Sequence, residues 1–188
     1  MNSIFEHFNK ILPMAKKEVE EITPLLKTKT VLKDEFLLHE NQTCKFLTFV
    51  KKGSFRSFHV NSNGKSTNLM LNSTHEFISN YDSYLSGLPS NISIQAIEVS
   101  EVITILKKDL DKLLETSLYW NKVGRIMAEN IFVISKLRLE SILYRTPKER
   151  YFDLIKCSPE FLKKYSLTDI SSFIGVTLQS LSRIRARI

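Results

Sequence analysis

Residues 165–185 read YSLTDISSFIGVTLQSLSRIR, two short helical patterns that are separated by a glycine. Ser166 can cap the first helix, and Asp169 three residues later makes a carboxylate variant of the capping box. Gly175 supplies the backbone freedom that a sharp turn needs, and Thr177 can cap the second helix. The pattern predicts a helix-turn-helix, the usual way of presenting a helix to DNA.

The two sides of the second helix differ in character. At about 100° per residue, Leu181, Ile184 and Ile188 share one apolar side. The other side is polar and basic, and no Asp or Glu follows Asp169 in the sequence. An anion is the natural partner of such a surface. Its residues are Gln179, Ser182, Arg183 and Ala186, with further charge from Arg185 and Arg187.

On spacing alone, an ordinary αα-hairpin explains these two helices as well. The distribution of charge favours the nucleic-acid interpretation. Residues 1–106 carry 11 Lys and Arg and 11 Asp and Glu, whereas residues 107–188 carry 16 and 9, so the net charge of +7 lies in the C-terminal part. A basic nucleic-acid-binding end joined to a neutral sensor or scaffold has this asymmetry.

The composition is that of a soluble globular protein, with 43% hydrophobic and 25% charged residues in a chain of 188. No apolar run approaches the roughly 18–20 residues that cross a bilayer, and the first residues lack the features of a signal peptide, so we expect a cytoplasmic protein. Cys44 and Cys157 lie far apart in the sequence, which disfavours a disulfide framework or an iron–sulfur cluster.

The N-terminal half changes from helical to β-rich patterns. Residues 1 to about 28 predict two short helices, interrupted by Pro13 and Pro24. Short runs with period-two alternation follow, and Asn63-Gly64 between two of them predicts a two-residue hairpin, because both central positions of that turn need positive φ. Such a series of strands predicts a barrel or sandwich. The runs cover residues 30–32, 35–38, 46–50, 54–60, 67–71, 92–97 and 102–106.

A long helix is predicted from residue 110 to about residue 144, a stretch with no proline. Its roughly 30 residues would span about 45 Å. Apolar residues cover more than one of its faces, so it needs two surfaces to pack against. One is the chain's own β domain, and the other is the same helix of a second copy; burial wholly within one chain is the alternative. The small-residue row expected at the contact between copies is Gly124, Ala128, Ile131 and Ser135.

This order of elements resembles the Crp-Fnr (catabolite activator and fumarate–nitrate regulator) family over essentially the whole chain. The resemblance implies an α+β fold: an N-terminal double-stranded β-helix, or jelly roll like a cyclic-nucleotide-binding domain, a long dimerisation helix and a C-terminal helix-turn-helix. The implied domains are residues 1–109, 110–145 and 146–188. Thr146, Pro147 and Glu149 form a capping box with proline in the first turn, which predicts a new helix where the third domain begins. The residues that carry the resemblance are 167–177, 180–184, Gly53 and 77–105.

The resemblance implies that the second helix of the pair enters the major groove. In the family's motif, the positions of Leu178, Gln179, Ser182 and Arg183 face base edges, while those of Thr177 and Ser180 hold phosphates. The chemistry fits, because glutamine can bind adenine N6 and N7, arginine can bind guanine O6 and N7, and leucine can contact a thymine methyl group. The resemblance also implies RNA polymerase as a partner.

The segment that binds cyclic nucleotide in the family differs here. The family has glycine and glutamate, then arginine followed by serine or threonine a dozen residues later; this chain has Ser79 and Asn80, then Ser90 and Asn91. Without the arginine, a buried phosphate lacks its bidentate partner, so we do not expect cyclic AMP as the ligand. Another small molecule could use a pocket lined by these four residues, with Arg56 or His75 as a donor.

We expect no metal and no cofactor, because the four histidines are scattered and no thiols cluster. The sequence given stops at Ile188, so backbone contacts like those of a trailing wing are expected from residues before 167, with Lys163 and Lys164 as candidates. No enzyme is indicated, since nucleophile–base pairs and Gly-rich phosphate loops are not recognisable.

Two hypotheses of function follow from these patterns. The leading one is a homodimeric, sequence-specific transcriptional regulator whose recognition helices lie about 34 Å apart. The alternative is a ligand-sensing or interaction module of the same fold that does not read DNA directly. The salt dependence of DNA binding separates the two.

Overall fold

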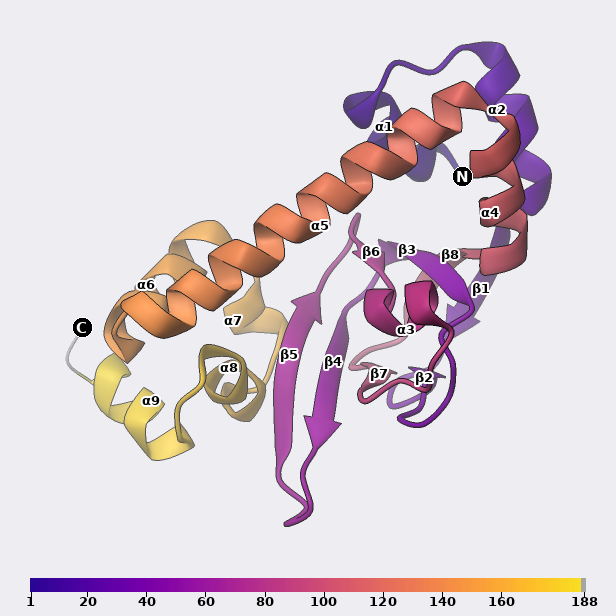
Figure 1. Ribbon diagram of the computed structural model, residues 1–188. Helices are drawn as coiled ribbons and strands as arrows, with labels where there is room; N and C mark the ends of the chain where they lie inside the picture. The colour runs from indigo at the N-terminus through magenta and orange to yellow at the C-terminus, as the bar shows by residue number, and fades with distance from the viewer. Residues whose placement is uncertain (187–188) are drawn as a thin grey trace.

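Two antiparallel four-stranded sheets form a roll between residues 27 and 106 (Figure 1). The computed structural model describes residues 1–186, so Arg187 and Ile188 lie outside the described residues. The first sheet has the order β1-β8-β3-β6 and the second the order β2-β7-β4-β5. The strands are β1 (Lys27–Val31), β2 (Phe36–Leu38), β3 (Phe46–Lys52), β4 (Phe55–Val60), β5 (Ser66–Asn72), β6 (Phe77–Ile78), β7 (Ser93–Ala96) and β8 (Ser100–Leu106).

The space between the two sheets is filled by side chains. Alternation along the strands turns Val50, Phe55, Ile94 and Val102 inward, and all four are fully buried. The jelly roll that the family resemblance implied is confirmed, and each predicted run overlaps an observed strand. The two-residue strand β6 was not predicted, because two residues are too few to show a period.

The turn between β4 and β5 corrects one prediction. Asn61 N–H donates to the Lys65 carbonyl, and Gly64 N–H donates to the Asn61 carbonyl, so three residues form the loop and not two. Gly64 has φ of 74°, but Asn63 is not among the residues with positive φ. This is the type I turn followed by a left-handed residue that closes three-residue hairpins, and glycine is needed only at its last position.

Helices pack against the outer side of the first sheet. The N-terminal elements are α1 (Asn2–Ile11), α2 (Lys16–Ile22) and the 3-10 helix η1 (Thr23–Leu25), and the prolines separate them as predicted. Phe8 packs edge-on against Trp120, with ring centroids 5.1 Å apart. This contact lies in a core shared by the helices and by Phe49 and Ile103 of the sheet.

The predicted helix from residue 110 to about 144 is instead two helices, α4 (Lys107–Thr116) and α5 (Leu118–Tyr144). They are separated by Ser117, whose backbone is extended, with φ of −122° and ψ of 117°. Serine favours helix caps over interiors because its hydroxyl finds other partners, and here that hydroxyl donates to Glu21 of α2. The chain reverses at this point, so α5 packs back on α4.

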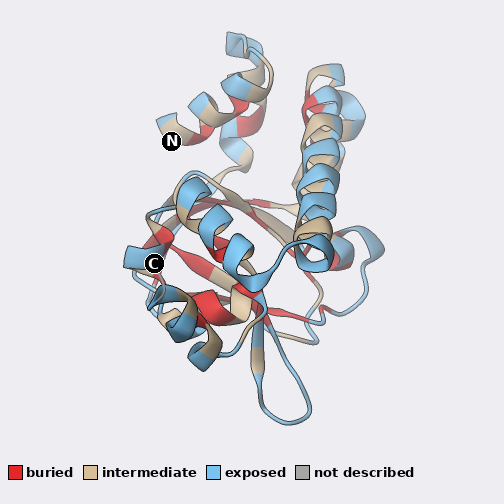
Figure 2. Ribbon diagram, turned by 90° about the vertical axis from the view of Figure 1, so that its left-hand side faces the viewer, coloured by how far each residue is buried: buried red, intermediate tan, exposed pale blue. Residues whose placement is uncertain are grey.

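The second half of α5 is exposed. Its buried residues, Trp120 and Val123, lie in the first two turns, and the rest of the helix is half-buried or exposed (Figure 2). Burial of the whole helix within one chain is therefore excluded for the described residues. Eight large apolar side chains in its second half are 50–76% exposed: Phe132, Val133, Ile134, Leu137, Leu139, Ile142, Leu143 and Tyr144.

The C-terminal helices enclose a third core, built around Tyr151, Ile170, Ile174 and Leu181. The predicted capping box of Thr146 is present, with both of its hydrogen bonds. The helices are α6 (Pro147–Cys157), α7 (Phe161–Lys164), α8 (Leu167–Ile174) and α9 (Leu178–Arg185), and a short helix α3 (Tyr81–Ser86) lies in the roll. Among residues 1–186, no helix is both long enough and apolar enough to span a membrane.

Candidate nucleic-acid interface

Helix α9 is held in the chain by its apolar side. Leu181 is fully buried, and Ile184 is half-buried in the same core. Thr177 caps the helix as predicted, because its hydroxyl accepts from the Ser180 N–H at 3.1 Å. Gly175 has φ of 74° and makes the turn between α8 and α9 in the left-handed region.

The opposite side of α9 is open to solvent, as the sequence predicted. Gln179, Ser182, Arg183 and Arg185 are exposed, and Leu178 is 42% exposed. Within residues 1–186, the side-chain hydrogen bonds of this helix are confined to its capping pair, Thr177 and Ser180. Its outward donors are therefore free for a ligand. The predicted contact Arg187 lies outside the described residues.

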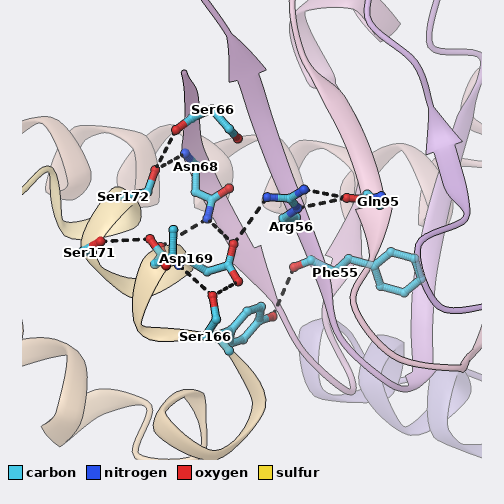
Figure 3. A network of polar contacts seen from close by, with 11 residues as sticks. Phe55, Arg56, Ser66, Asn68, Gln95, Ser166, Asp169, Ser171 and Ser172 are labelled. Carbon is cyan, nitrogen blue, oxygen red and sulfur yellow. Dashed lines mark hydrogen bonds and ion pairs between the residues drawn. The ribbon is translucent and has the colours of Figure 1, made fainter. Parts of the chain in front are cut away.

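Helix α8 lies against the edge strand β5 (Figure 3). The Asp169 carboxylate lies 3.4 Å from an Arg56 guanidinium nitrogen and accepts from the Asn68 amide at 3.1 Å. One turn further along, the Ser172 hydroxyl accepts from the Asn68 N–H at 2.8 Å and lies 3.4 Å from the Ser66 carbonyl oxygen. Asp169 and Arg56 are 17% and 26% exposed, so water screens this ion pair less than one on the open surface.

Tyr165 makes a second attachment, just before α8. Its hydroxyl donates to the Asn72 carbonyl oxygen at 2.6 Å and lies 3.1 Å from that of Phe55. Burial, together with the nearby Glu76 carboxyl, raises the pKa of Tyr165, which keeps the phenol protonated as a donor. The edge strand β5 thus has its backbone partly covered by the helix-turn-helix.

Two arginines hold the C-terminal end of α8. Arg138 of α5 donates to the Phe173 carbonyl and stacks over the Phe173 ring, 4.1 Å from its centroid. Arg150 of α6 donates to the Ile174 carbonyl at 2.7 Å. Cations at this end complement the helix dipole and its unpaired carbonyls. The sequence analysis missed both residues, since nothing in their spacing shows which helix end they will meet.

Lys163 and Lys164 are differently placed. Both lie on α7, where Lys163 is exposed and Lys164 is half-buried. Lys164 lies near Glu76. Burial raises the pKa of Glu76, and the charge of Lys164 partly offsets this rise. Because Glu76 follows β5, Lys164 lies near the C-terminal end of β5, at the opposite end from the β4–β5 turn.

The structure brings two of the five predicted effector residues, Asn80 and Ser90, into contact, but it does not gather all five in one pocket. Asn80 is buried and donates to the Ser90 hydroxyl at 2.6 Å, while Ser79 donates to the Phe46 carbonyl at 3.0 Å. Asn91 is exposed. Arg56 is the clearest correction, because its guanidinium binds Gln95 and Asp169 on the side of the helix-turn-helix. The residue types alone gave no sign of that partner.

A cavity of about 520 Å³ lies elsewhere on the roll, and none of these five residues lines it. It opens between the loop before β3 and the start of α4, and Cys44 and Lys107 are among its lining residues. Across the described part of the chain, no three His, Cys, Asp or Glu side chains gather closely enough to hold a metal ion.

Comparisons with known proteins place this architecture. Residues 28–117 match the model of the cyclic nucleotide-binding domain. The solved structure of FixK2 from Bradyrhizobium japonicum superposes with a TM-score of 0.72 at 17% identity, covering 86% of this chain and 83% of that one. A Crp/Fnr regulator from Eubacterium rectale gives 0.71 at 16% identity, covering 97% and 87%. The chain has the Crp-Fnr fold. Among curated protein sequences, none matches.

Another solved structure also matches this chain over nearly its whole length. The catabolite activator protein of Thermus thermophilus gives a TM-score of 0.60 at 15% identity, with 96% of this chain and 85% of that one covered. The domain match ends at residue 117, where α4 and α5 meet. Helices α5 to α9 lie beyond the matched domain, and the structural similarity extends over them.

Proposed function

We propose that this chain is a sequence-specific DNA-binding transcriptional regulator that reads the major groove with α9. The observation that carries the proposal is the exposed, unpaired row of Gln179, Ser182 and Arg183 on a helix whose other side is anchored by Leu181. These side chains can reach base edges without breaking a contact within residues 1–186. Thr177 and Ser180, at the N-terminus of α9, are placed to hold phosphates.

Selection from a random-sequence library tests this proposal. We expect the wild type to select a half-site. For Arg183→Ala we expect relaxed preference at one base pair and a loss of about 1–3 kcal/mol in the free energy of DNA binding. Arg125→Ala is the matched control, because Arg125 is an exposed arginine on α5 that pairs with Glu129. Recovery of no half-site, with binding that ignores sequence, would favour the module without direct DNA reading.

We further propose a homodimer formed through the second half of α5. The apolar side chains at 132–144 are left 50–76% exposed by residues 1–186, and a patch of this kind usually marks a partner surface. The row proposed from the sequence does not sit there as a unit. Gly124 faces α4, since a Cβ at that position would lie 2.8 Å from Leu114 Cδ2, and Ala128 and Ile131 are half-buried. Ser135 alone of the four is exposed.

Sedimentation measures this pairing. We expect a dimer for the wild type and a monomer for the double variant Phe132→Glu, Leu139→Glu, because charges placed in an apolar contact must be desolvated. Phe152→Glu is the control, since Phe152 is 40% exposed on α6, outside the patch. A double variant that stays dimeric would move the contact away from α5.

We infer that cyclic AMP is not the effector. Asn80 and Ser90 are buried and already bonded to each other, and Ser79, Asn80, Ser90 and Asn91 carry no charge to balance a phosphate. Titration calorimetry with cyclic AMP should show no saturable heat, and DNA affinity should not change when it is added. Saturable binding would contradict the inference. The alternative effector pocket with Arg56 as donor finds no support in the position of Arg56.

A further inference from the structure

The β4–β5 hairpin runs past α8 and projects beyond it. The contacts advance in step, from Tyr165 at Asn72, through Asp169 at Asn68, to Ser172 at Ser66. Helix and strand are therefore antiparallel neighbours, and the hairpin turn lies beyond the C-terminal end of α8. A strand rises about 3.3 Å per residue and a helix 1.5 Å, so the hairpin extends further than the helix. Its tip is the lowest point of the molecule in both views (Figures 1 and 2).

The charge of this region is one-sided. Residues 41–75 contain five Lys and Arg and no Asp or Glu. Two of these cations have partners in the fold, since Arg56 pairs with Asp169 and Lys51 with Glu101. Lys65 at the turn is exposed, and no ion pair of it is present among the described residues. An acid-free element next to a DNA-reading helix favours contact with phosphate.

The turn is also well ordered by its own hydrogen bonds. The Asn61 side-chain oxygen accepts from the N–H groups of Asn63 and Lys65, both at 3.0 Å. All five residues, 61–65, are exposed. A preorganised loop loses little conformational entropy when it meets a ligand.

We propose that the turn 61–65 contacts the phosphodiester backbone of DNA beside the half-site that α9 reads. The first helix of a helix-turn-helix crosses the DNA backbone, and this hairpin is attached to that helix and projects past it toward the turn before α9. The roll thus supplies a wing-like contact, and the attachment of α8 to β5 fixes its position. This inference rests on the proposed function of α9.

The test compares Lys65→Gln with Lys45→Gln. Lys45 is also exposed and also in the acid-free segment, but it lines the cavity beside α4. Fluorescence anisotropy gives the affinity for the selected site and for random DNA between 50 and 200 mM salt. For Lys65→Gln we expect the slope of log affinity against log salt to weaken by about 0.9, equally on both DNAs. The ratio of wild-type affinity to variant affinity should therefore fall about 3.5-fold between 50 and 200 mM salt. Lys45→Gln should match wild type.

A second arm tests the attachment. In Arg56→Gln, the ion pair with Asp169 is lost while the bonds of Asn68 and Tyr165 remain, so the hairpin should be held less firmly beside α8. We expect the slope change caused by Lys65→Gln to fall below half of its value in the wild-type background. An undiminished change would show that the network does not position the turn.

The outcomes separate the two proposals. A Lys65→Gln slope equal to that of wild type, while Arg183→Ala still relaxes the half-site, overturns the hairpin contact and leaves the reading helix in place. Tighter binding by Lys65→Gln also overturns it, because the turn would then obstruct DNA. Wild-type protein that selects no sequence, with no salt dependence, overturns the function of α9 and this inference with it.

Discussion

Helices α8 and α9 have the same length and similar caps, but the chain uses their polar residues in opposite ways. Each has eight residues, and a serine or threonine hydroxyl caps each one. Two polar side chains of α8 bind the roll, since Asp169 and Ser172 both contact Asn68 of β5. Those of α9 face solvent. A polar residue on a helix therefore indicates function only once its neighbours are known.

The difference has a mechanical meaning. Helix α8 is held by β5 along its side, and by Arg138 of α5 and Arg150 of α6 at its C-terminal end. Helix α9 is anchored mainly through one buried side, which leaves its outer surface free to enter a groove. The held helix can thus set the angle at which the free one meets DNA. The experiments below alter one helix at a time.

The largest effect is expected at the anchor of α9. Leu181→Ala removes a fully buried side chain and should lower the free energy of unfolding by about 2–5 kcal/mol. Urea denaturation measures this loss. Leu178→Ala, three residues earlier and 42% exposed, is the control and should stay within about 0.5 kcal/mol of wild type. Equal losses at the two positions would mean that α9 has no anchored side.

The next effect tests how α8 is held. Asp169→Ala removes the ion pair with Arg56 and the bond from the Asn68 amide, and leaves the buried Asn68 amide and the half-buried Arg56 without this acceptor. We expect unfolding to become easier by about 1–3 kcal/mol. Asp153→Ala on α6 is the control, because Asp153 is exposed. If the two variants unfold at the same urea concentration, the network does not stabilise the docked helix.

A smaller effect is expected at the other end of α8. Arg138→Met keeps an apolar stem but loses the bond to the Phe173 carbonyl and the cation–π contact, together about 1 kcal/mol. The loss is limited because burial lowers the pKa of Arg138 and its Nε has no partner among the described residues. Thermal unfolding compares it with Arg125→Met, an exposed pair worth about 0.3–0.5 kcal/mol. If the melting temperature falls less for Arg138→Met than for Arg125→Met, Arg138 does not have this capping role.

Sequence reasoning succeeded where structure is decided locally. The caps Ser166, Thr146 and Thr177 and the turn at Gly175 each depend on a few neighbouring residues, and all four are present. The strands were predictable for the same reason, since alternation marks a half-buried face. The exposed side of α9 followed from helical period alone.

It failed where the answer depends on which surfaces meet. Arg56 was predicted as a donor in an effector pocket, yet its guanidinium pairs with Asp169, which is 113 residues away in the sequence. Gly124 was predicted to lie between two copies because small residues allow helices to approach closely. It does allow a close approach, but to Leu114 of α4 in the same chain. The reversal at Ser117 made that contact, and a single serine in a helical pattern does not predict it.

The smallest expected effect is a pH dependence of stability, which arises at Glu76 near Tyr165 and Lys164. Burial raises the pKa of Glu76, against the lowering effect of hydrogen bonds from Ser73 and Asn72. The folded state then favours the protonated form, so the stability contributed by Glu76 is greatest below its unfolded pKa and is lost as pH rises through the folded one. Glu76→Gln is neutral at every pH, so its stability relative to wild type should increase as pH rises.

Glu101→Gln is the control of opposite sign. A hydrogen bond from Lys51 lowers the pKa of Glu101, so the stability that Glu101 contributes is lost as pH falls. Denaturation midpoints across pH 4–8 compare the three proteins, and parallel profiles for the two variants would show that burial does not perturb Glu76.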